Sequence, residues 1–241
     1  MKSRLLGVTV IIPCLNEEAA IGPVVRDVLA QGVDAVLVVD NGSTDRTAAV
    51  AQEAGARIVQ QPKRGYGNAC AAGVAAVADP AAILCFMDGD GSDVPSLLPA
   101  LIAPIESGSA DFVMGSRLRG QREAGSLTPQ QILAARLAGI LLRLTYGVRF
   151  TDMSPLRAIR ADRLAALGMR ETTYGWNLEM QMRAAAAGLR CLELPADHRL
   201  RRGGESKVSG NLTAGVSAAW KISSTFLRLA ASLRRGAAIS P

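Results

Sequence analysis

The chain has 241 residues, of which 49% are hydrophobic and 20% charged, a globular composition long enough to form a core without disulfide or metal staples. The charge is uneven: residues 1–116 carry 7 basic and 13 acidic side chains and residues 117–241 carry 20 basic and 8 acidic, so the first half suits a cation and the second half anions. The four cysteines form no CxxC pair, which argues against a disulfide framework. Aromatic residues make up only 4%, which argues against base stacking on nucleic acid, and a single histidine excludes a multi-histidine metal site.

Strands and helices alternate through the first half of the chain. Apolar, β-branched runs at 8–12 and 35–39 predict strands buried on both faces, and helices are expected over 17–30 and from the Ser43 region to residue 54. A strand at 57–60, a helix from Gly65 to about residue 78, a strand at 82–87, a helix over 95–107 and a strand at 111–115 complete the series. This order predicts an α/β fold with a mainly parallel, Rossmann-like sheet and helices on both faces.

The second half begins with an amphipathic helix. Thr128 and Pro129 predict its start, and its apolar stripe, next to Arg136 and Arg143, consists of Leu133, Leu137, Ile140, Leu141 and Leu144. A loop over 152–157 leads to a short strand, and a helix over 176–187, a strand over 189–194 and a polar loop over 199–210 follow. From residue 212 the tail is again amphipathic, with a stripe of Ile222, Phe226, Leu229 and Leu233.

Two segments of the chain bear on membrane association. Residues 1–13 contain a short apolar run that stops at Pro13, which predicts a first strand and not a signal peptide. Every apolar stretch is shorter than the roughly 20 residues that span a bilayer. The basic, amphipathic segments 129–146 and 212–235 instead predict reversible attachment to an anionic membrane surface. The alternative is that both stripes pack on the sheet.

Polar residues follow three of the predicted buried strands, at 13–17, 40–45 and 88–93. Because the carboxyl ends of parallel strands meet at one edge, where α/β proteins bind ligands, these loops are expected to lie together. The third loop contains Asp88, Asp90 and Asp93, which repel one another unless a cation compensates their charge. Such a loop suits Mg²⁺ or Mn²⁺, and Mg²⁺ typically completes its shell with water and phosphate oxygens, which indicates a diphosphate ligand. The chain has no GxxxxGK[ST] motif, and no GxGxxG follows the first strand.

Four segments together resemble glycosyltransferase family 2, whose members have the GT-A fold. They are Val-Ile-Ile-Pro-Cys-Leu-Asn-Glu at 10–17, Val-Val-Asp-Asn-Gly-Ser-Thr-Asp at 38–45, Gly-Tyr-Gly-Asn-Ala at 65–69 and Met-Asp-Gly-Asp at 87–90, the last matching the family's DxD metal motif. Segments 115–117, 151–157, 174–179 and 202–207, with Arg136, look most like dolichol-phosphate mannose synthase and its bacterial polyprenyl-phosphate relatives. The resemblance covers about residues 8–225 and implies a GT-A fold with C-terminal amphipathic helices.

The resemblance implies a role for each matching residue. The residues expected to line the nucleotide pocket are Pro13, Asn16 and Glu17, with Asp40 facing the base. Those expected at the diphosphate are Asp88 and Asp90, which would hold Mg²⁺ or Mn²⁺, and Arg202, Ser206 and Lys207, which would close over it as a lid. Arg117 and Arg136 would receive an acceptor phosphate. The chain departs from its relatives at three places: Asn41 affects the base contact, Ser92 affects a third metal ligand, and Ser154-Pro155 affects the sugar pocket.

The implied function is inverting, metal-dependent transfer of a hexosyl group from a nucleotide sugar, of the GDP-mannose or UDP-glucose type, to a polyprenyl phosphate, with Asp90, Arg117 and Glu179 as catalytic residues. A phosphate acceptor is already anionic, whereas an alcohol acceptor requires a carboxylate base, for which Glu179 or Asp152 is the candidate. The alternatives are a family 2 enzyme with a soluble sugar, glycerate or glycan acceptor, a sugar nucleotidyltransferase, and a nucleotide-binding module without activity. His198 is predicted as a loop or packing residue.

The expected organisation is a glycosyltransferase domain over 1–210, with a donor and metal half over 1–116 and an acceptor half over 117–210. Residues 211–241 form a basic, amphipathic tail in this prediction. The expected location is the cytoplasm, at the inner face of the membrane. No nucleic-acid partner is expected, and the sequence is compatible with a homo-oligomer.

Overall fold

The computed structural model describes residues 5–203 and 223–231. Within them, strands form one seven-stranded sheet in the order β3-β2-β1-β4-β6-β5-β7. The strands are β1 (Leu5–Cys14), β2 (Val33–Asp40), β3 (Arg57–Gln60), β4 (Ile83–Phe86), β5 (Phe112–Ser116), β6 (Arg157–Arg160) and β7 (Cys191–Pro195). All neighbouring strands pair in parallel except β6, which is antiparallel to both β4 and β5. The predicted α/β fold with a mainly parallel sheet is confirmed.

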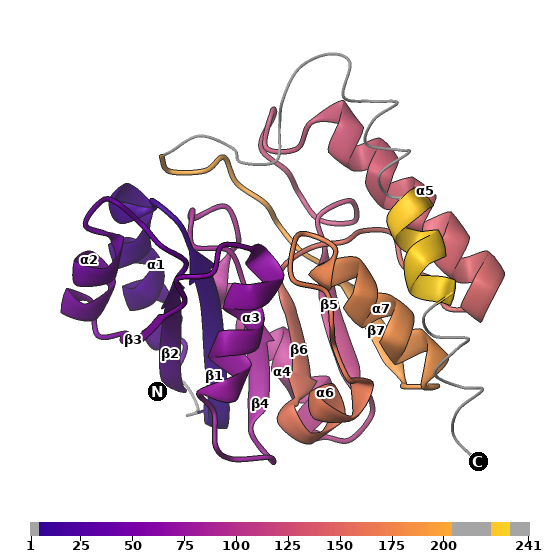
Figure 1. Ribbon diagram of the computed structural model, residues 1–241, viewed down its shortest axis with the longest axis horizontal. Coiled ribbons are helices and arrows are strands. Elements are labelled where there is room, and N and C mark those ends of the chain that lie inside the picture. The colour runs from indigo at the N-terminus through magenta and orange to yellow at the C-terminus, as the bar shows by residue number, and fades with distance from the viewer. Residues whose placement is uncertain (1–4, 204–222, 232–241) are drawn as a thin grey trace.

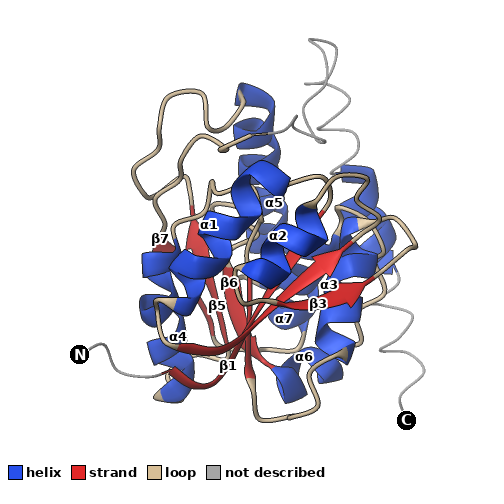
Figure 2. Ribbon diagram, turned by 90° about the vertical axis from the view of Figure 1, so that its left-hand side faces the viewer, coloured by secondary structure: helices blue, strands red, loops and turns tan. Residues whose placement is uncertain are grey.

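Helices cover both faces of the sheet (Figure 2). They are α1 (Glu18–Leu29), α2 (Thr47–Glu53), α3 (Tyr66–Ala75), α4 (Leu98–Glu106) after a 3-10 turn at Pro95–Leu97, α5 (Pro129–Tyr146), α6 (Ala161–Leu167) and α7 (Trp176–Ala186), followed by a helix at 223–231. The sequence patterns predicted all of these except α6, which is only seven residues long and ends at Gly168 in the left-handed conformation. A segment this short has too few turns to show helical periodicity.

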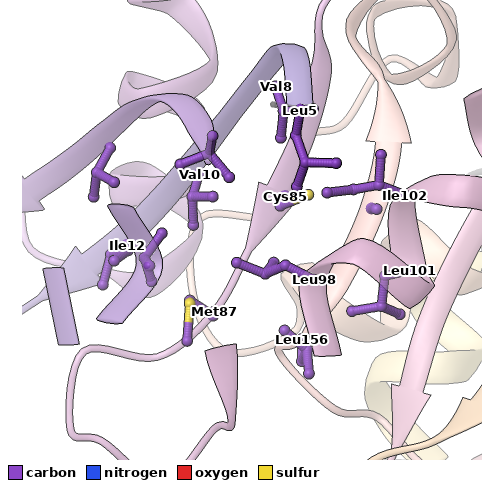
Figure 3. Close-up of a cluster of buried hydrophobic side chains, with 14 of the residues drawn as sticks. Leu5, Val8, Val10, Ile12, Cys85, Met87, Leu98, Leu101, Ile102 and Leu156 are labelled. Atoms are coloured by element: carbon purple, nitrogen blue, oxygen red, sulfur yellow. The ribbon is translucent and has the colours of Figure 1, made fainter. Parts of the chain in front are cut away.

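The core lies in two layers, one on each face of the sheet. Along β1, Val8, Val10 and Ile12 point into the layer that α1 and α4 cover, and Ile11 points into the opposite layer. Figure 3 shows part of the first layer, where these β1 side chains and Leu98 of α4 belong to one buried cluster. The second layer is covered by α3, α5, α6, α7 and helix 223–231. A strand buried on both faces requires a continuous apolar run, which is the pattern that β1 carries.

Helix α5 presents its large apolar side chains outward. Leu133, Ile140 and Leu144 are 54%, 57% and 79% exposed, whereas the side that contacts the protein consists mainly of small residues, Ala134, Ala135, Ala138 and Gly139, with Leu142. Thr128 and Gln131 form a capping box at the start of α5, and Gly147, with φ +75°, ends it. The stripe predicted for this helix is thus largely directed away from the core.

Helix 223–231 behaves in the opposite way. Phe226 and Leu229 are buried in the same layer as Trp176 of α7, and Figure 1 shows this helix, in yellow, beside α5. For Phe226 and Leu229 the alternative holds: these two side chains of the predicted tail stripe pack on the protein's own core and do not face a membrane. Ile222 and Leu233 lie outside the described residues. No helix in the described ranges is long and apolar enough to cross a membrane.

Candidate active site

The carboxyl ends of β1 and β2 are joined by hydrogen bonds between the loops that follow them. The Asn16 Oδ1 atom accepts a hydrogen bond from the Thr44 backbone nitrogen at 2.8 Å, and the Asn16 backbone nitrogen donates to Ser43 Oγ at 3.0 Å. Asn16 has φ +54°, a left-handed conformation that asparagine tolerates better than most residues. The Glu17 backbone nitrogen donates to Thr47 Oγ1 at 2.8 Å. The structure thus brings the first two predicted loops together.

Asp40 and Asn41 at the end of β2 organise the loop after β3. Asp40 Oδ1 accepts a hydrogen bond from the Ser43 backbone nitrogen at 2.9 Å. Asn41 Nδ2 donates to the carbonyl oxygens of residues 61 and 63, and its Oδ1 accepts from the Gly65 nitrogen, each at 2.8 Å. An aspartate could not donate these bonds. The departure from the family pattern at Asn41 therefore has a structural use here. Pro13, half-buried near the end of β1, pairs with Val39 of β2.

The loop after β4 carries the three aspartates. Asp93 is 2% exposed, and its Oδ2 accepts a hydrogen bond from the Asp88 nitrogen at 3.0 Å. Asp90 Oδ1 accepts from the Ser92 nitrogen at 2.9 Å and from Ser92 Oγ at 2.6 Å. Burial, with repulsion from Asp93 and Asp90, raises the pKa of Asp88 well above its ordinary value, and burial is the main cause that raises the pKa of Asp93 to about 6. A cation placed among these carboxylates would relieve the repulsion.

Two arginines from the segment 199–203 cross this loop. Arg201 Nη2 lies 3.0 Å from Glu17 Oε1 and 3.8 Å from Asp90 Oδ2. The predicted lid residue Arg202 donates its backbone nitrogen to the Asp90 carbonyl at 2.9 Å, but its exposed side chain lies 3.9 Å from Asp27. Arg201, which the sequence reasoning did not single out, is thus the arginine whose side chain faces the acidic loop. Ser206 and Lys207 lie outside the described residues.

His198 lies next to the same loop, which the sequence reasoning did not foresee. The side chain is 5% exposed, its Nδ1 has no hydrogen-bond partner among the described residues, and Asp93 Oδ1 is 3.8 Å away. Burial and, second, the charge of Arg117 lower the pKa of His198 to about 4, so the imidazole is neutral at physiological pH. A neutral imidazole nitrogen with a free lone pair is a metal ligand. Only the fold shows its position, because residues 93 and 198 are far apart in the chain.

The residues at this edge fit a divalent ion bound together with a diphosphate. Asp88 and Asp90 supply carboxylate oxygens, the donors that Mg²⁺ or Mn²⁺ prefers, and the His198 nitrogen lies beside the same loop. In the described part of the chain, no three His, Cys, Asp or Glu side chains come together so that they could hold a metal ion by themselves. An ion here would therefore need phosphate and water oxygens to complete its coordination, which is the usual situation for Mg²⁺.

Arg117 is held by a buried carboxylate at the end of β5. Its Nε lies 2.7 Å from Asp152 Oδ2 and its Nη2 2.9 Å from Asp152 Oδ1, and its backbone nitrogen donates to the same carboxylate. Glu193 Oε1 in turn accepts hydrogen bonds from the backbone nitrogens of Thr151 and Asp152, at 2.8 and 3.2 Å. This network fixes the guanidinium near the acidic loop. Arg136, the other predicted phosphate ligand, is exposed on α5.

Glu179 is engaged by structural contacts. Its carboxylate accepts hydrogen bonds from the backbone nitrogens of Arg170 and Glu171 and from Arg183 Nε, the last at 2.8 Å. These contacts account for the burial of Glu179 without a catalytic role. Burial raises the pKa of Asp152, but its hydrogen bonds with Arg117 outweigh that effect and leave the pKa below its ordinary value. Neither of the two carboxylates predicted as a general base is thus poised to take a proton.

Comparison with known proteins identifies the family. The family model described as glycosyl transferase family 2 matches residues 9–167. The chain belongs to glycosyl transferase family 2. This assignment makes it a glycosyltransferase, as the resemblance implied, and the matched residues include the loops at 13–17, 40–45 and 88–93.

Two relatives and one solved structure illustrate the similarity. An uncharacterized glycosyltransferase of Mycobacterium tuberculosis is 41% identical over 90% of this chain and 97% of its own length. A dolichyl-phosphate hexose transferase of Haloferax volcanii is 34% identical over 83% of this chain and 85% of its own. The crystal structure of glucosyl-3-phosphoglycerate synthase from Mycobacterium tuberculosis in complex with phosphoglyceric acid covers 92% of this chain and 79% of its own, at 25% identity and a TM-score of 0.72. The predicted GT-A fold is confirmed by this match.

Proposed function

We propose that the chain transfers a hexosyl group, with inversion, from a nucleotide sugar to a polyprenyl phosphate at the cytoplasmic face of a membrane. The bond between the anomeric carbon and the nucleoside diphosphate breaks, and a phosphate oxygen of the acceptor forms the new bond to that carbon. The similarity to a dolichyl-phosphate hexose transferase of Haloferax volcanii supports this acceptor class. The alternative is a soluble acceptor, which the similarity to glucosyl-3-phosphoglycerate synthase supports.

The observation that carries the proposal is the outward apolar face of α5. Leu133, Ile140 and Leu144 form an exposed stripe on one helix, and Arg136 and Arg143 are exposed on the same helix. An amphipathic helix with apolar and cationic side chains facing solvent is typical of proteins that bind the surface of an anionic bilayer. A soluble acceptor requires no such surface. A lipid acceptor does, because its phosphate reaches the enzyme only at the membrane–water boundary.

The acidic edge supplies the donor half of the proposal. Asp88 and Asp90 would hold Mg²⁺ or Mn²⁺, which would neutralise the diphosphate as it leaves, and the His198 nitrogen is proposed as a further ligand. Arg201 of the segment 199–203, whose Nη2 lies 3.0 Å from Glu17 Oε1, would add a second positive charge next to the diphosphate. Asn16, Glu17 and Asp40 would shape the nucleotide pocket, since their loops are joined by hydrogen bonds at this edge.

The acceptor half is supported by the state of the carboxylates. An alcohol acceptor needs a base, and Asp152 and Glu179 are both engaged by arginine and backbone donors. A phosphate monoester needs no base, because it is already ionised. Arg117 keeps Nη1 outside its ion pair with Asp152. Burial lowers the pKa of Arg117, but the hydrogen bonds and charge of Asp152, and after them the charges of Asp93 and Asp88, outweigh burial and raise it. Arg117 would position the incoming phosphate beside the donor.

Donor binding is tested by calorimetry with UDP and GDP, each with and without Mn²⁺. The wild-type protein should bind one of them only when Mn²⁺ is present. Asp90→Ala should lose that metal-dependent binding, because the diphosphate would lose the cation that offsets its charge. Glu106→Ala, which removes an exposed carboxylate from α4, is the matched control and should bind like the wild type. Unchanged, metal-dependent affinity in a folded Asp90→Ala variant would refute the site.

The acceptor is tested by vesicle co-sedimentation and by transfer assays. Wild-type protein should sediment with anionic vesicles at low salt and less at high salt, and a Leu133→Ser, Ile140→Ser, Leu144→Ser variant should not sediment. Neutral vesicles are the control. Sugar transfer should then be seen with a polyprenyl phosphate and not with phosphoglyceric acid. Transfer to phosphoglyceric acid by protein that does not bind vesicles would favour the soluble-acceptor alternative.

A further inference from the structure

Helix 223–231 is tied to a loop next to the donor site through one ion pair. Arg228 Nη2 lies 2.5 Å from Glu171 Oε2, and the other carboxylate oxygen of Glu171 accepts a hydrogen bond from Thr173 Oγ1 at 3.0 Å. Arg228 is mostly exposed, whereas Glu171 is buried. Phe226 and Leu229 anchor the helix in the core on either side of Arg228 in sequence, so packing fixes the backbone from which the Arg228 side chain reaches Glu171.

The loop that carries Glu171, residues 168–175, lies directly against the start of α3. The Asn68 backbone nitrogen donates to the Thr172 carbonyl at 3.1 Å. A Cβ atom added at Gly65 would lie 2.3 Å from the Thr172 oxygen, and one added at Gly67 would lie 2.2 Å from the Glu171 oxygen. The two backbones are therefore closer than any side chain would allow, and the glycines are required for this contact.

The start of α3 is in turn joined to the nucleotide edge. The Gly65 nitrogen donates to Asn41 Oδ1 at 2.8 Å, and Asn41 follows Asp40 at the end of β2. Tyr66 stacks on Tyr174 of the loop, with ring centroids 6.2 Å apart. Burial is the main cause that raises the pKa of both tyrosines, and the charge of Asp88 adds to it in each.

We propose that helix 223–231 is a positioning element for the donor pocket, and that Arg228 acts through Glu171 and the loop 168–175 on the turn at residues 65–67. The chain of contacts runs from the core-anchored helix to the Glu171 carboxylate, from the loop backbone to α3, and from Gly65 to Asn41. Arg228 touches no substrate in this scheme. The inference rests on the proposed nucleotide-sugar site, because it assigns the turn at 65–67 to that pocket.

The test uses the full chain and the affinities for UDP–Mn²⁺ and GDP–Mn²⁺. Arg228→Ala should raise the Kd of the nucleotide that the wild type binds about threefold to fivefold, as expected for loss of one partly exposed ion pair. Arg228→Lys should restore most of the affinity, because the contact uses a single nitrogen. Arg163→Ala, which removes an exposed arginine from α6, is the matched control and should change nothing.

A double-mutant cycle tests the route through Glu171. Glu171→Ala also removes the hydrogen bond from Thr173, so its Kd should rise at least as much as that of Arg228→Ala. The double variant Arg228→Ala, Glu171→Ala should have the Kd of Glu171→Ala, because the Arg228 contact is already lost in that variant. Amide hydrogen exchange without nucleotide should become faster at residues 65–69 and 168–175 in all three variants, and not only in helix 223–231. Wild-type affinity in Arg228→Ala, or effects that multiply in the double variant, would overturn the inference. If the wild type binds neither nucleotide, the proposed function fails, while the exchange rates at 65–69 still decide whether Arg228 positions that turn.

Discussion

The ion pair between Arg117 and Asp152 offers a direct test of how the interior of the acceptor half is built. The Asp152 side chain is fully buried and accepts hydrogen bonds from the Arg117 backbone nitrogen, Nε and Nη2 at 2.7 to 2.9 Å. Asp152→Ala removes all of them and leaves a guanidinium that is only 14% exposed. The free energy of unfolding should therefore fall, since the remaining charge is costly to bury.

The size of the effect follows from the surroundings of Arg117. Removing one partner of a buried pair typically costs about 3–5 kcal/mol. Asp93 and Asp88 also attract this guanidinium and offset part of the loss, so we expect about 3 kcal/mol, near the lower end. The double variant Asp152→Ala, Arg117→Met removes both charges and should recover at least about 1 kcal/mol relative to Asp152→Ala.

Urea unfolding at pH 7, followed by circular dichroism, measures these differences. Asp162→Ala breaks the exposed pair with Arg160 and should cost less than about 1 kcal/mol, which makes it the matched control. The native pKa of Asp152 is depressed, so its stabilising effect is present above the unfolded pKa of about 3.9 and is lost as the pH falls through the native value. The gap between wild type and Asp152→Ala should thus narrow in acid. A loss below 1 kcal/mol at pH 7, or a double variant less stable than the single one, would refute this reasoning.

Two further predictions concern the donor site. His198→Ala should raise the Mn²⁺ concentration needed for nucleotide binding about tenfold or more, as is typical for changes at metal-site residues. Calorimetry at fixed nucleotide over a Mn²⁺ series measures this concentration, and an unchanged value would show that His198 is only a packing residue. Gly67→Ala should lower the free energy of unfolding by about 1–3 kcal/mol, because the new methyl group would lie 2.2 Å from the Glu171 oxygen. A urea midpoint equal to that of the wild type would show that the backbone of α3 and the backbone of loop 168–175 can move apart at no cost.

The sequence predicts the donor half of the fold well because its strands are buried on both faces. An apolar run such as Val8–Ile12 in β1 is buried on both sides only in the middle of a sheet that has helices on both faces. The helices between the strands therefore pack on these two faces. Once the strands are parallel, the loops with Asn16, Asp40 and Asp88 must share an edge. The hydrogen bonds between Asn16 and Thr44 join the first two loops, and Arg201, which lies 3.0 Å from Glu17 and 3.8 Å from Asp90, links the first loop to the third.

The sequence does not predict contacts that depend on the path of the chain after residue 116. Strand β6 lies between β4 and β5 and is antiparallel to both, and no local sequence pattern predicts this direction. His198 and Arg201 reach the acidic loop only because the segment after β7 passes over it. The tail and α5 carry similar stripes, yet Phe226 is buried and Leu144 is exposed. Periodicity shows that a helix has an apolar face but not which surface that face meets.

The orientation of α5 depends on how closely its small side can approach the protein, and Gly139 tests this. A Cβ at this position would lie 2.2 Å from the Phe150 carbonyl oxygen, which is backbone and cannot rotate away. Replacing glycine by alanine inside a helix normally stabilises it by about 1 kcal/mol. Overpacking against a fixed atom costs about 1–3 kcal/mol, so the two effects oppose each other and the steric one should prevail, for a net loss of about 1–2 kcal/mol in the free energy of unfolding.

Thr145→Ala, at an exposed position of the same helix, isolates the gain in helix propensity without the contact. It should leave the protein as stable as the wild type or slightly more stable in urea. Gly139→Ala should be less stable, and its vesicle binding at low salt should fall as well if displacement of α5 tilts Ile140 and Leu144 away from their common face. A Gly139→Ala protein more stable than the wild type would mean that α5 can move outward at no cost, and that its small residues do not determine which face it exposes.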